Sequence, residues 1–167
     1  MDPVFATLFA TLLAGIGGTL STDLWALARR RWLGIPPPDY GLVGRWLGYM
    51  RQGRFRHARI ADAAALRGER VLGWTAHYLT GIAFAALLPL AWGEAWLRQP
   101  TLAPAVAVGV VTVLAPWLLM QPGMGAGVAA RLTPYPARAR LHSLLTHIVF
   151  GIGLYATAWL VARAAFH

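Results

Sequence analysis

The chain has 167 residues, of which 57% are hydrophobic and 13% charged, and its formal net charge is +9. This composition is too apolar for an ordinary soluble domain of this length and predicts an integral membrane protein. The chain contains no cysteine, which excludes disulfides, thiolate nucleophiles and sulfur ligands for zinc or iron–sulfur clusters. Any site in this protein therefore uses nitrogen and oxygen groups.

Apolar stretches dominate the chain, and each is close to the ~20 residues that a helix needs to cross ~30 Å of hydrocarbon. Because little chain remains outside them, we expect one membrane domain over residues 1–167. Its fold class is all-α, an integral membrane bundle of four transmembrane helices. In chain order, the predicted spans are 4–28, 71–92, 102–120 and 141–162.

The arginines gather in two connectors, residues 29–70 and 121–140, whereas the opposite side of the predicted bundle has only Arg98 and Arg163. The positive-inside rule therefore predicts that both connectors are cytoplasmic and that the N- and C-termini lie on the outer side. The same placement predicts contact with the anionic headgroups of the lipid bilayer and argues against binding of nucleic acid.

The first connector contains a predicted amphipathic helix. Three prolines, 36–38, precede Asp39, a suitable N-cap for a helix over Tyr40–Met50. Two interpretations of this helix are open. It rests in the headgroup region as a linker, or Asp39, Tyr40 and Arg45 form a lid over the cytoplasmic mouth of the bundle. A further short helix is predicted over Ile60–Leu66. The apolar residues that recur at helical spacing in the longer helix are Leu42, Val43, Trp46, Leu47 and Met50.

The second connector begins with glycines and other small residues, 123–130, which permit an unwound or half-inserted backbone where the third span meets the cytoplasm. A Walker lysine and a GxGxxG spacing are both missing, so nucleotide binding is not expected.

In three of the four predicted spans, an ionisable residue lies at a similar depth. Asp23 lies six residues before the first arginine after its span, and His77 and His147 each lie seven residues after the last arginine before theirs. At ~1.5 Å per residue all three are roughly 9 to 10 Å inside the cytoplasmic end. With Gln121 at the end of the third span, they form a predicted polar layer. An intramembrane carboxylate is costly and needs a partner.

Several functions of this layer stay open. Asp23, His77, Gln121 and His147 could bind or pass a small solute, ion or proton, as in a transporter, with Asp23 orienting one imidazole. The same groups could instead be interhelical hydrogen bonds without further function, in a homo-oligomer or in an accessory subunit of a membrane complex. No serine or threonine is placed as an obvious nucleophile, so no catalytic residue is assigned and an enzyme is not favoured.

Cofactor binding is a further alternative. His77 and His147 each begin an HxxxGI segment, and a glycine four residues after a histidine lies above the imidazole on the same helix face. Two such histidines could ligate a haem, and together with Asp23 they match a two-histidine, one-carboxylate set for a divalent metal.

One set of short motifs is spread over nearly the whole chain. It comprises Asp23-Leu24-Trp25, Asp39-Tyr40, Gly44-Arg45-Trp46-Leu47-Gly48, Gly73-Trp74, His77-Tyr78, Gly81-Ile82, Gln121-Pro122, Gly125-Ala126-Gly127, His147, Phe150-Gly151 and Leu154-Tyr155. In these motifs the chain resembles a family of small bacterial inner-membrane proteins, domain of unknown function 2938 (DUF2938). The resemblance implies a four-span domain in the bacterial cytoplasmic membrane, and it brings no activity, substrate or cofactor.

Overall fold

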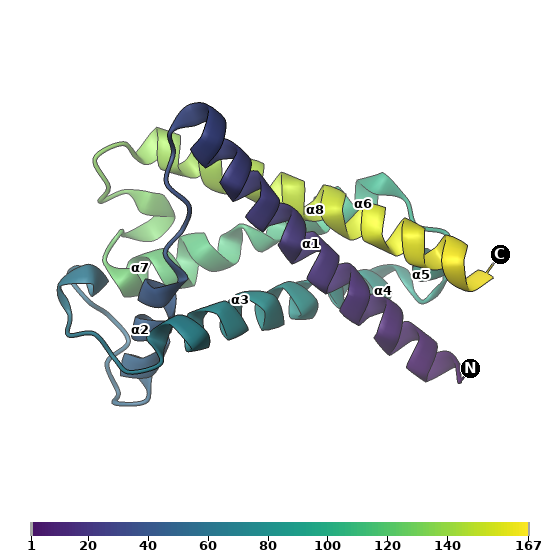
Figure 1. Ribbon diagram of the computed structural model, residues 1–167, viewed down its shortest axis with the longest axis horizontal. Helices are drawn as coiled ribbons and strands as arrows, with labels where there is room; N and C mark the ends of the chain where they lie inside the picture. The colour runs from purple at the N-terminus through teal and green to yellow at the C-terminus, as the bar shows by residue number, and fades with distance from the viewer. Residues whose placement is uncertain (1, 167) are drawn as a thin grey trace. The chain divides into compact units, whose positions relative to one another are not determined.

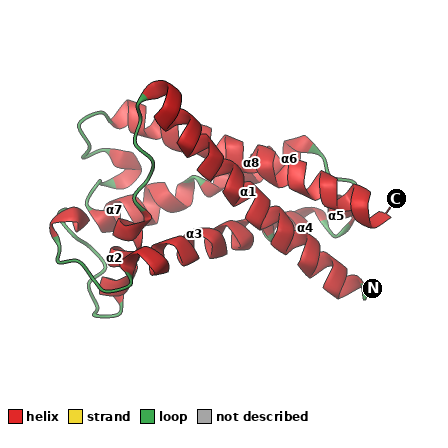
Figure 2. Ribbon diagram, in the orientation of Figure 1, coloured by secondary structure: helices red, strands yellow, loops and turns green. Residues whose placement is uncertain are grey.

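The structure is a computed structural model that describes residues 2–166, and every regular element in this range is a helix (Figure 2). The elements in chain order are α1 (Pro3–Leu33), α2 (Tyr40–Met50), η1 (Ile60–Asp62), α3 (Glu69–Ala85), α4 (Leu87–Trp92), α5 (Ala95–Arg98), α6 (Leu102–Thr112), η2 (Pro116–Met120), α7 (Gln121–Met124), η3 (Val128–Ala130) and α8 (Pro136–Phe166).

Among the described residues, four helical segments are long and apolar enough to cross a membrane, as the sequence predicted. They run over Val4–Leu33, Glu69–Trp92, Leu102–Met124 and Pro136–Ala164. Each extends past the predicted apolar stretch because the flanking residues continue the helix. The first helix ends at Gly34, whose left-handed φ of 65° lets its N–H donate to the carbonyl of Arg29.

The third span is less regular than predicted. α6 ends at Thr112, and residues Pro116–Met120 (η2) form a π-helical turn before α7. Pro116 has no N–H to donate to the preceding turn, which explains why the α-helical hydrogen-bond pattern is interrupted there.

The chain forms two compact units, and the first consists of the residues up to Pro37, Tyr78–Thr112 and those from Leu145 onward. It contains all of α1 and most of α8, which cross in Figure 1. Glycines permit close approach within it: a Cβ on Gly17 would overlap Thr157, and one on Gly153 would overlap Ser21. The core of this unit comprises Ala14, Ala85, Leu88, Trp96, Leu97, Ala105, Val108, Phe150, Leu154 and Ala158.

The second unit, residues 38–77 and 113–144, contains most of both arginine-rich connectors. Its core is a cluster centred on Trp46, Tyr49 and Ile60. The apolar residues of α2 therefore pack against protein. A polar contact joins the two connectors, since the His57 N–H donates to the Gly123 carbonyl at 2.9 Å. Within the first connector, the Trp46 indole donates to the Phe55 carbonyl at 2.9 Å.

Two predictions within this unit can be compared with the structure directly. α2 occupies Tyr40–Met50 as predicted, and its predicted cap is confirmed, because the Asp39 carboxylate accepts from the Gly41 N–H at 2.8 Å. The predicted helix over Ile60–Leu66 is largely wrong. Only the single turn η1 forms, and Ala63 after it is extended. The carbonyls of Ala61 and Ala63 accept hydrogen bonds from Arg45, which holds this segment in an irregular path.

Candidate functional site

Asp23 lies on α1 and accepts a hydrogen bond from the hydroxyl of Tyr78 on α3, with Oη and Oδ2 2.8 Å apart. Both residues belong to the first unit and are partly buried. The predicted need of Asp23 for a partner is therefore met at least in part by a phenol. Tyr78 was not among the predicted site residues, although it directly follows His77 in the chain.

His147 lies on α8 in the same unit, and its ring is fixed through Nδ1. This nitrogen is 3.2 Å from the Gly109 carbonyl oxygen and 3.1 Å from Oγ1 of Thr112, both on α6. A carbonyl oxygen only accepts, so Nδ1 carries the proton and Nε2 is left as the acceptor. Within residues 2–166, Nε2 has no hydrogen-bond partner. His147 thus presents an unprotonated nitrogen inside a candidate span.

Close packing positions this imidazole. A Cβ on Gly109 would overlap the carbonyl of His147 and contact Gly151, so α6 and α8 touch backbone to backbone at this point. The space beside Gly151, four residues after His147, is occupied by the backbone of Ala105 and Val106. This arrangement leaves no space at Gly151 for a flat ligand.

His77 belongs to the second unit, where its ring stacks on Tyr40 with centroids 4.0 Å apart and an interplanar angle of 24°. Trp74 completes the cluster, 4.6 Å from Tyr40 and 5.8 Å from His77 between centroids. Tyr40, predicted as part of a lid, is thus the residue by which α2 holds the His77 imidazole. Gln121, also in this unit, begins α7, and its side-chain oxygen is buried without a hydrogen bond in the described part of the chain.

The structure thus divides the predicted polar layer between its units. Asp23 and His147 belong to the first, and His77 and Gln121 to the second. Each of these four residues has local surroundings that the sequence did not predict. That all four lie at the same depth stays a prediction. Among residues 2–166, no group of three His, Cys, Asp or Glu side chains is close enough to hold a metal ion. A metal site made of His77, His147 and Asp23 therefore has no support.

Arg45, the last predicted lid residue, is held in a fixed position. Its guanidinium forms a bidentate pair with Glu69, Nε to Oε2 at 2.8 Å and Nη2 to Oε1 at 2.7 Å. Its remaining nitrogen donates to the carbonyls of Ala61 and Ala63. The hydrogen bond from Arg45 to the Glu69 carboxylate raises the pKa of Arg45 above its ordinary value. Arg45 therefore joins α2, η1 and the start of α3, and its partner Glu69 was not predicted from the sequence.

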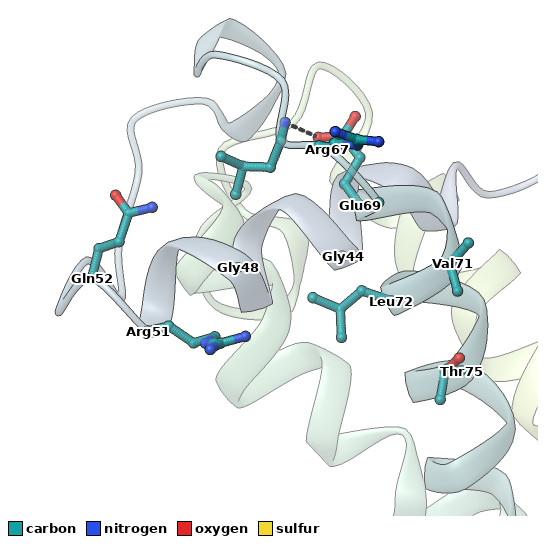
Figure 3. A pocket seen from close by; sticks show the side chains of 11 residues that line it. Gly44, Gly48, Arg51, Gln52, Arg67, Glu69, Val71, Leu72 and Thr75 are labelled. Carbon is teal, nitrogen blue, oxygen red and sulfur yellow. Dashed lines mark hydrogen bonds between the residues drawn. The ribbon is translucent and has the colours of Figure 1, made fainter.

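An open groove of about 910 Å³ lies in the second unit between α2 and the first turns of α3 (Figure 3). Glycines of α2 form part of its wall. Arginine and glutamine side chains reach its edge from the residues just after α2 and from the loop before α3, and aliphatic side chains come from α3. The lining residues are Gly44, Gly48, Arg51, Gln52, Leu66, Arg67, Gly68, Glu69, Val71, Leu72 and Thr75.

Comparison with known proteins gives one match. A search of curated proteins and a search of solved structures each found no similar protein. A family model with the description "Protein of unknown function (DUF2938)" matches residues 12–161, which is most of the chain and includes Asp23, His77, Gln121 and His147. The chain belongs to this uncharacterised family, as its motifs indicated.

Proposed function

We propose that this protein is a multi-pass protein of the bacterial inner membrane that binds or passes a proton or small solute at polar groups within its spans. The groups that we assign to this role in the first unit are the Asp23–Tyr78 pair and His147 with Thr112. The observation that carries the proposal is the state of His147, which is oriented through Nδ1 and keeps Nε2 open. An imidazole that donates through Nδ1 keeps Nε2 as an acceptor to which a proton or a polar solute can bind.

The proposed orientation has both termini on the outer side and the second unit on the cytoplasmic side. It is supported by the arginines, since residues 38–77 and 113–144 contain ten of the fifteen in the chain. α2 lies in this proposal at the level of the lipid headgroups. In support, Gly44 of α2 packs on Gly73, which lies only one turn inside the span that begins at Glu69.

The absence of cysteine makes the orientation simple to test, because a single introduced thiol is the only one in the chain. Ala61→Cys places it in the first connector, and Gln99→Cys places it between α5 and α6; both side chains are exposed. We expect a membrane-impermeant maleimide added to intact cells to label Gln99→Cys and to leave Ala61→Cys unlabelled until the inner membrane is opened. The reverse pattern contradicts the proposed orientation.

The proposed activity is tested in liposomes that contain a pH-sensitive dye. After an external acid pulse, we expect liposomes with wild-type protein to acidify faster than empty ones. Asp23→Asn and His147→Gln should each return the rate towards that of empty liposomes. Asp62→Asn removes the same charge as Asp23→Asn at an exposed site and serves as the matched control.

Small solutes are tested in parallel by their effect on the melting temperature of the detergent-solubilised protein. If wild-type liposomes acidify no faster than empty ones and no solute or cation in the panel stabilises the protein, the polar groups are structural hydrogen bonds only. That combined result overturns the proposal.

A further inference from the structure

The groove between α2 and α3 combines features that are not used by the proposed proton or solute site. Arg51 and Gln52 reach it from the end of α2, and Arg67 reaches it from the loop before α3 (Figure 3). Val71 and Leu72 of α3 also line it. The groove therefore has one arginine on each of two sides, Arg51 at the end of α2 and Arg67 before α3, and an aliphatic wall on α3 (Figure 3).

The charge in this groove is not balanced by the protein. Within the described residues, neither Arg51 nor Arg67 makes a side-chain hydrogen bond or an ion pair. The one acid in the lining, Glu69, is neutralised by Arg45 and also accepts the Leu66 N–H at 2.8 Å. Two exposed guanidinium groups therefore remain to bind an anion, and their planar donor geometry is suited to phosphate.

The aliphatic wall leads into the second candidate span. Val71 is 72% exposed and Leu72 40% exposed, and both lie in the first turn of the segment Glu69–Trp92. Gly44 and Gly48 place no side chains in the groove opposite these residues. An apolar chain can therefore lie against the start of α3 while its polar end lies in the groove between Arg51 and Arg67.

We propose that this groove is a binding site for one anionic phospholipid, with its headgroup lying in the groove between Arg51 and Arg67 and an acyl chain against Val71 and Leu72. Its volume of about 910 Å³ is of the size that protein sites use for small ligands. The position of the headgroup at the start of a span agrees with how basic residues beside membrane helices recognise anionic lipids. The proposal rests on the membrane insertion in the proposed function and is independent of Asp23 and His147.

The test measures binding of phosphatidylglycerol to the purified full chain in mild detergent, by native mass spectrometry over a lipid titration. Each arginine near an anionic headgroup contributes about a fivefold increase in affinity. The double variant Arg51→Gln, Arg67→Gln should therefore bind phosphatidylglycerol about 25-fold more weakly than wild type. The zwitterionic phosphatidylcholine should bind both proteins equally weakly.

A matched control removes two arginines of the same unit that do not line the groove. Arg56→Gln, Arg131→Gln makes the same change in net charge at two exposed positions. We expect it to keep wild-type affinity for phosphatidylglycerol. Equal loss of affinity in both double variants would mean diffuse attraction by net charge, and it overturns the proposal of a site.

Two additional measurements distinguish a lipid from a free anion and separate the groove from the proton or solute site. If inorganic phosphate at millimolar concentration displaces the lipid, the groove binds a free anion and the lipid proposal is wrong. Asp23→Asn should bind phosphatidylglycerol like wild type, because it leaves the groove intact. If wild-type protein acidifies liposomes but does not bind phosphatidylglycerol, only this inference is contradicted. If the protein does not float with liposomes, it is not inserted in the membrane, and both proposals are contradicted.

Discussion

Gly44 on α2 and Gly73 on α3 face each other across a contact in which a Cβ on either residue would overlap the backbone of the opposite helix. A Cβ on Gly44 would overlap the carbonyl of Glu69 and one on Gly73 would overlap the carbonyl of Tyr40. The backbones of these helices therefore touch, and no side chain fits between them. This contact brings Tyr40 to His77 and Arg45 to Glu69 in the second unit.

The first prediction concerns this glycine contact. Gly73→Ala should lower the free energy of unfolding by about 1 to 3 kcal/mol, because the methyl group has no space and α2 must move away. The measurement is unfolding in mixed micelles with increasing SDS, followed by helical circular dichroism. Gly48→Ala is the control, since its Cβ would meet only the end of the flexible Leu66 side chain. Equal stability of the two variants contradicts the packing argument.

The second prediction concerns the ion pair between Arg45 and Glu69. Their side chains are only 13% and 17% exposed, and the pair has two parallel hydrogen bonds. Arg45→Lys keeps the charge but loses the planar fork, so we expect a loss of about 1 to 3 kcal/mol in stability. Arg59→Lys is the control. It changes an exposed ion pair in which Arg59 Nε and Asp62 Oδ2 are 3.5 Å apart, and it should lower the free energy of unfolding by less than about 0.5 kcal/mol. The same SDS unfolding assay checks both variants. Similar losses of stability would show that the planar guanidinium of Arg45 adds nothing beyond its charge.

The third prediction concerns the hydrogen bond from Tyr78 to Asp23. Tyr78→Phe leaves the ring in place and removes the donor, so it should destabilise the protein by about 1 to 2 kcal/mol. In a double-mutant cycle with Asp23→Asn, the two losses should be less than additive, because either change alone already removes the charged hydrogen bond. Tyr155→Phe is the control, because the Tyr155 hydroxyl makes no hydrogen bond within the described residues and lies at the edge of the core of the first unit. It should change the free energy of unfolding little. Additive losses in the cycle would rule out a direct interaction.

The fourth prediction concerns the tautomer of His147. Because the Gly109 carbonyl lies 3.2 Å from Nδ1, the neutral ring should carry its proton on Nδ1. Nitrogen NMR of histidine-labelled protein distinguishes a protonated from an unprotonated ring nitrogen, and His147→Gln assigns the signal. Thr112→Val removes the second contact to Nδ1 and should leave the same tautomer, since the carbonyl remains. A ring protonated on Nε2 would contradict the arrangement and remove the support for His147 in the proposed function.

The spans and α2 could be predicted because their determinants are local. Runs of apolar residues favour a membrane helix wherever they occur, and Asp39 caps α2 with a contact to a residue only two positions away. The interruption at Pro116 also has a local cause, since a proline within a helix removes one N–H. Hydropathy alone does not reveal it, because the residues around Pro116 are as apolar as the rest of the span.

The partners of the polar residues could not be predicted in the same way. Asp23 and Tyr78 are separated by 55 positions in the chain, and their contact depends on how two helices rotate about their axes. His147 and Thr112 are 35 positions apart and meet only because Gly109 and Gly151 allow α6 and α8 to touch. A count of residues from the membrane edge sets the depth of a side chain and leaves its direction open.

The π-helical turn at Pro116–Met120 has a consequence for insertions and deletions in this region. A π-helical turn holds one residue more than the α-helical turn that it replaces. Loss of Pro116 would remove both the extra residue and the missing N–H, so the segment could close into an ordinary α-helix without rotating α7, and Gly123 would still meet the indole of Trp46. Loss of one residue from α6 would turn Gly123 by about 100° and remove it from that contact. Deletion of Pro116 should therefore be tolerated better than deletion of one residue from α6.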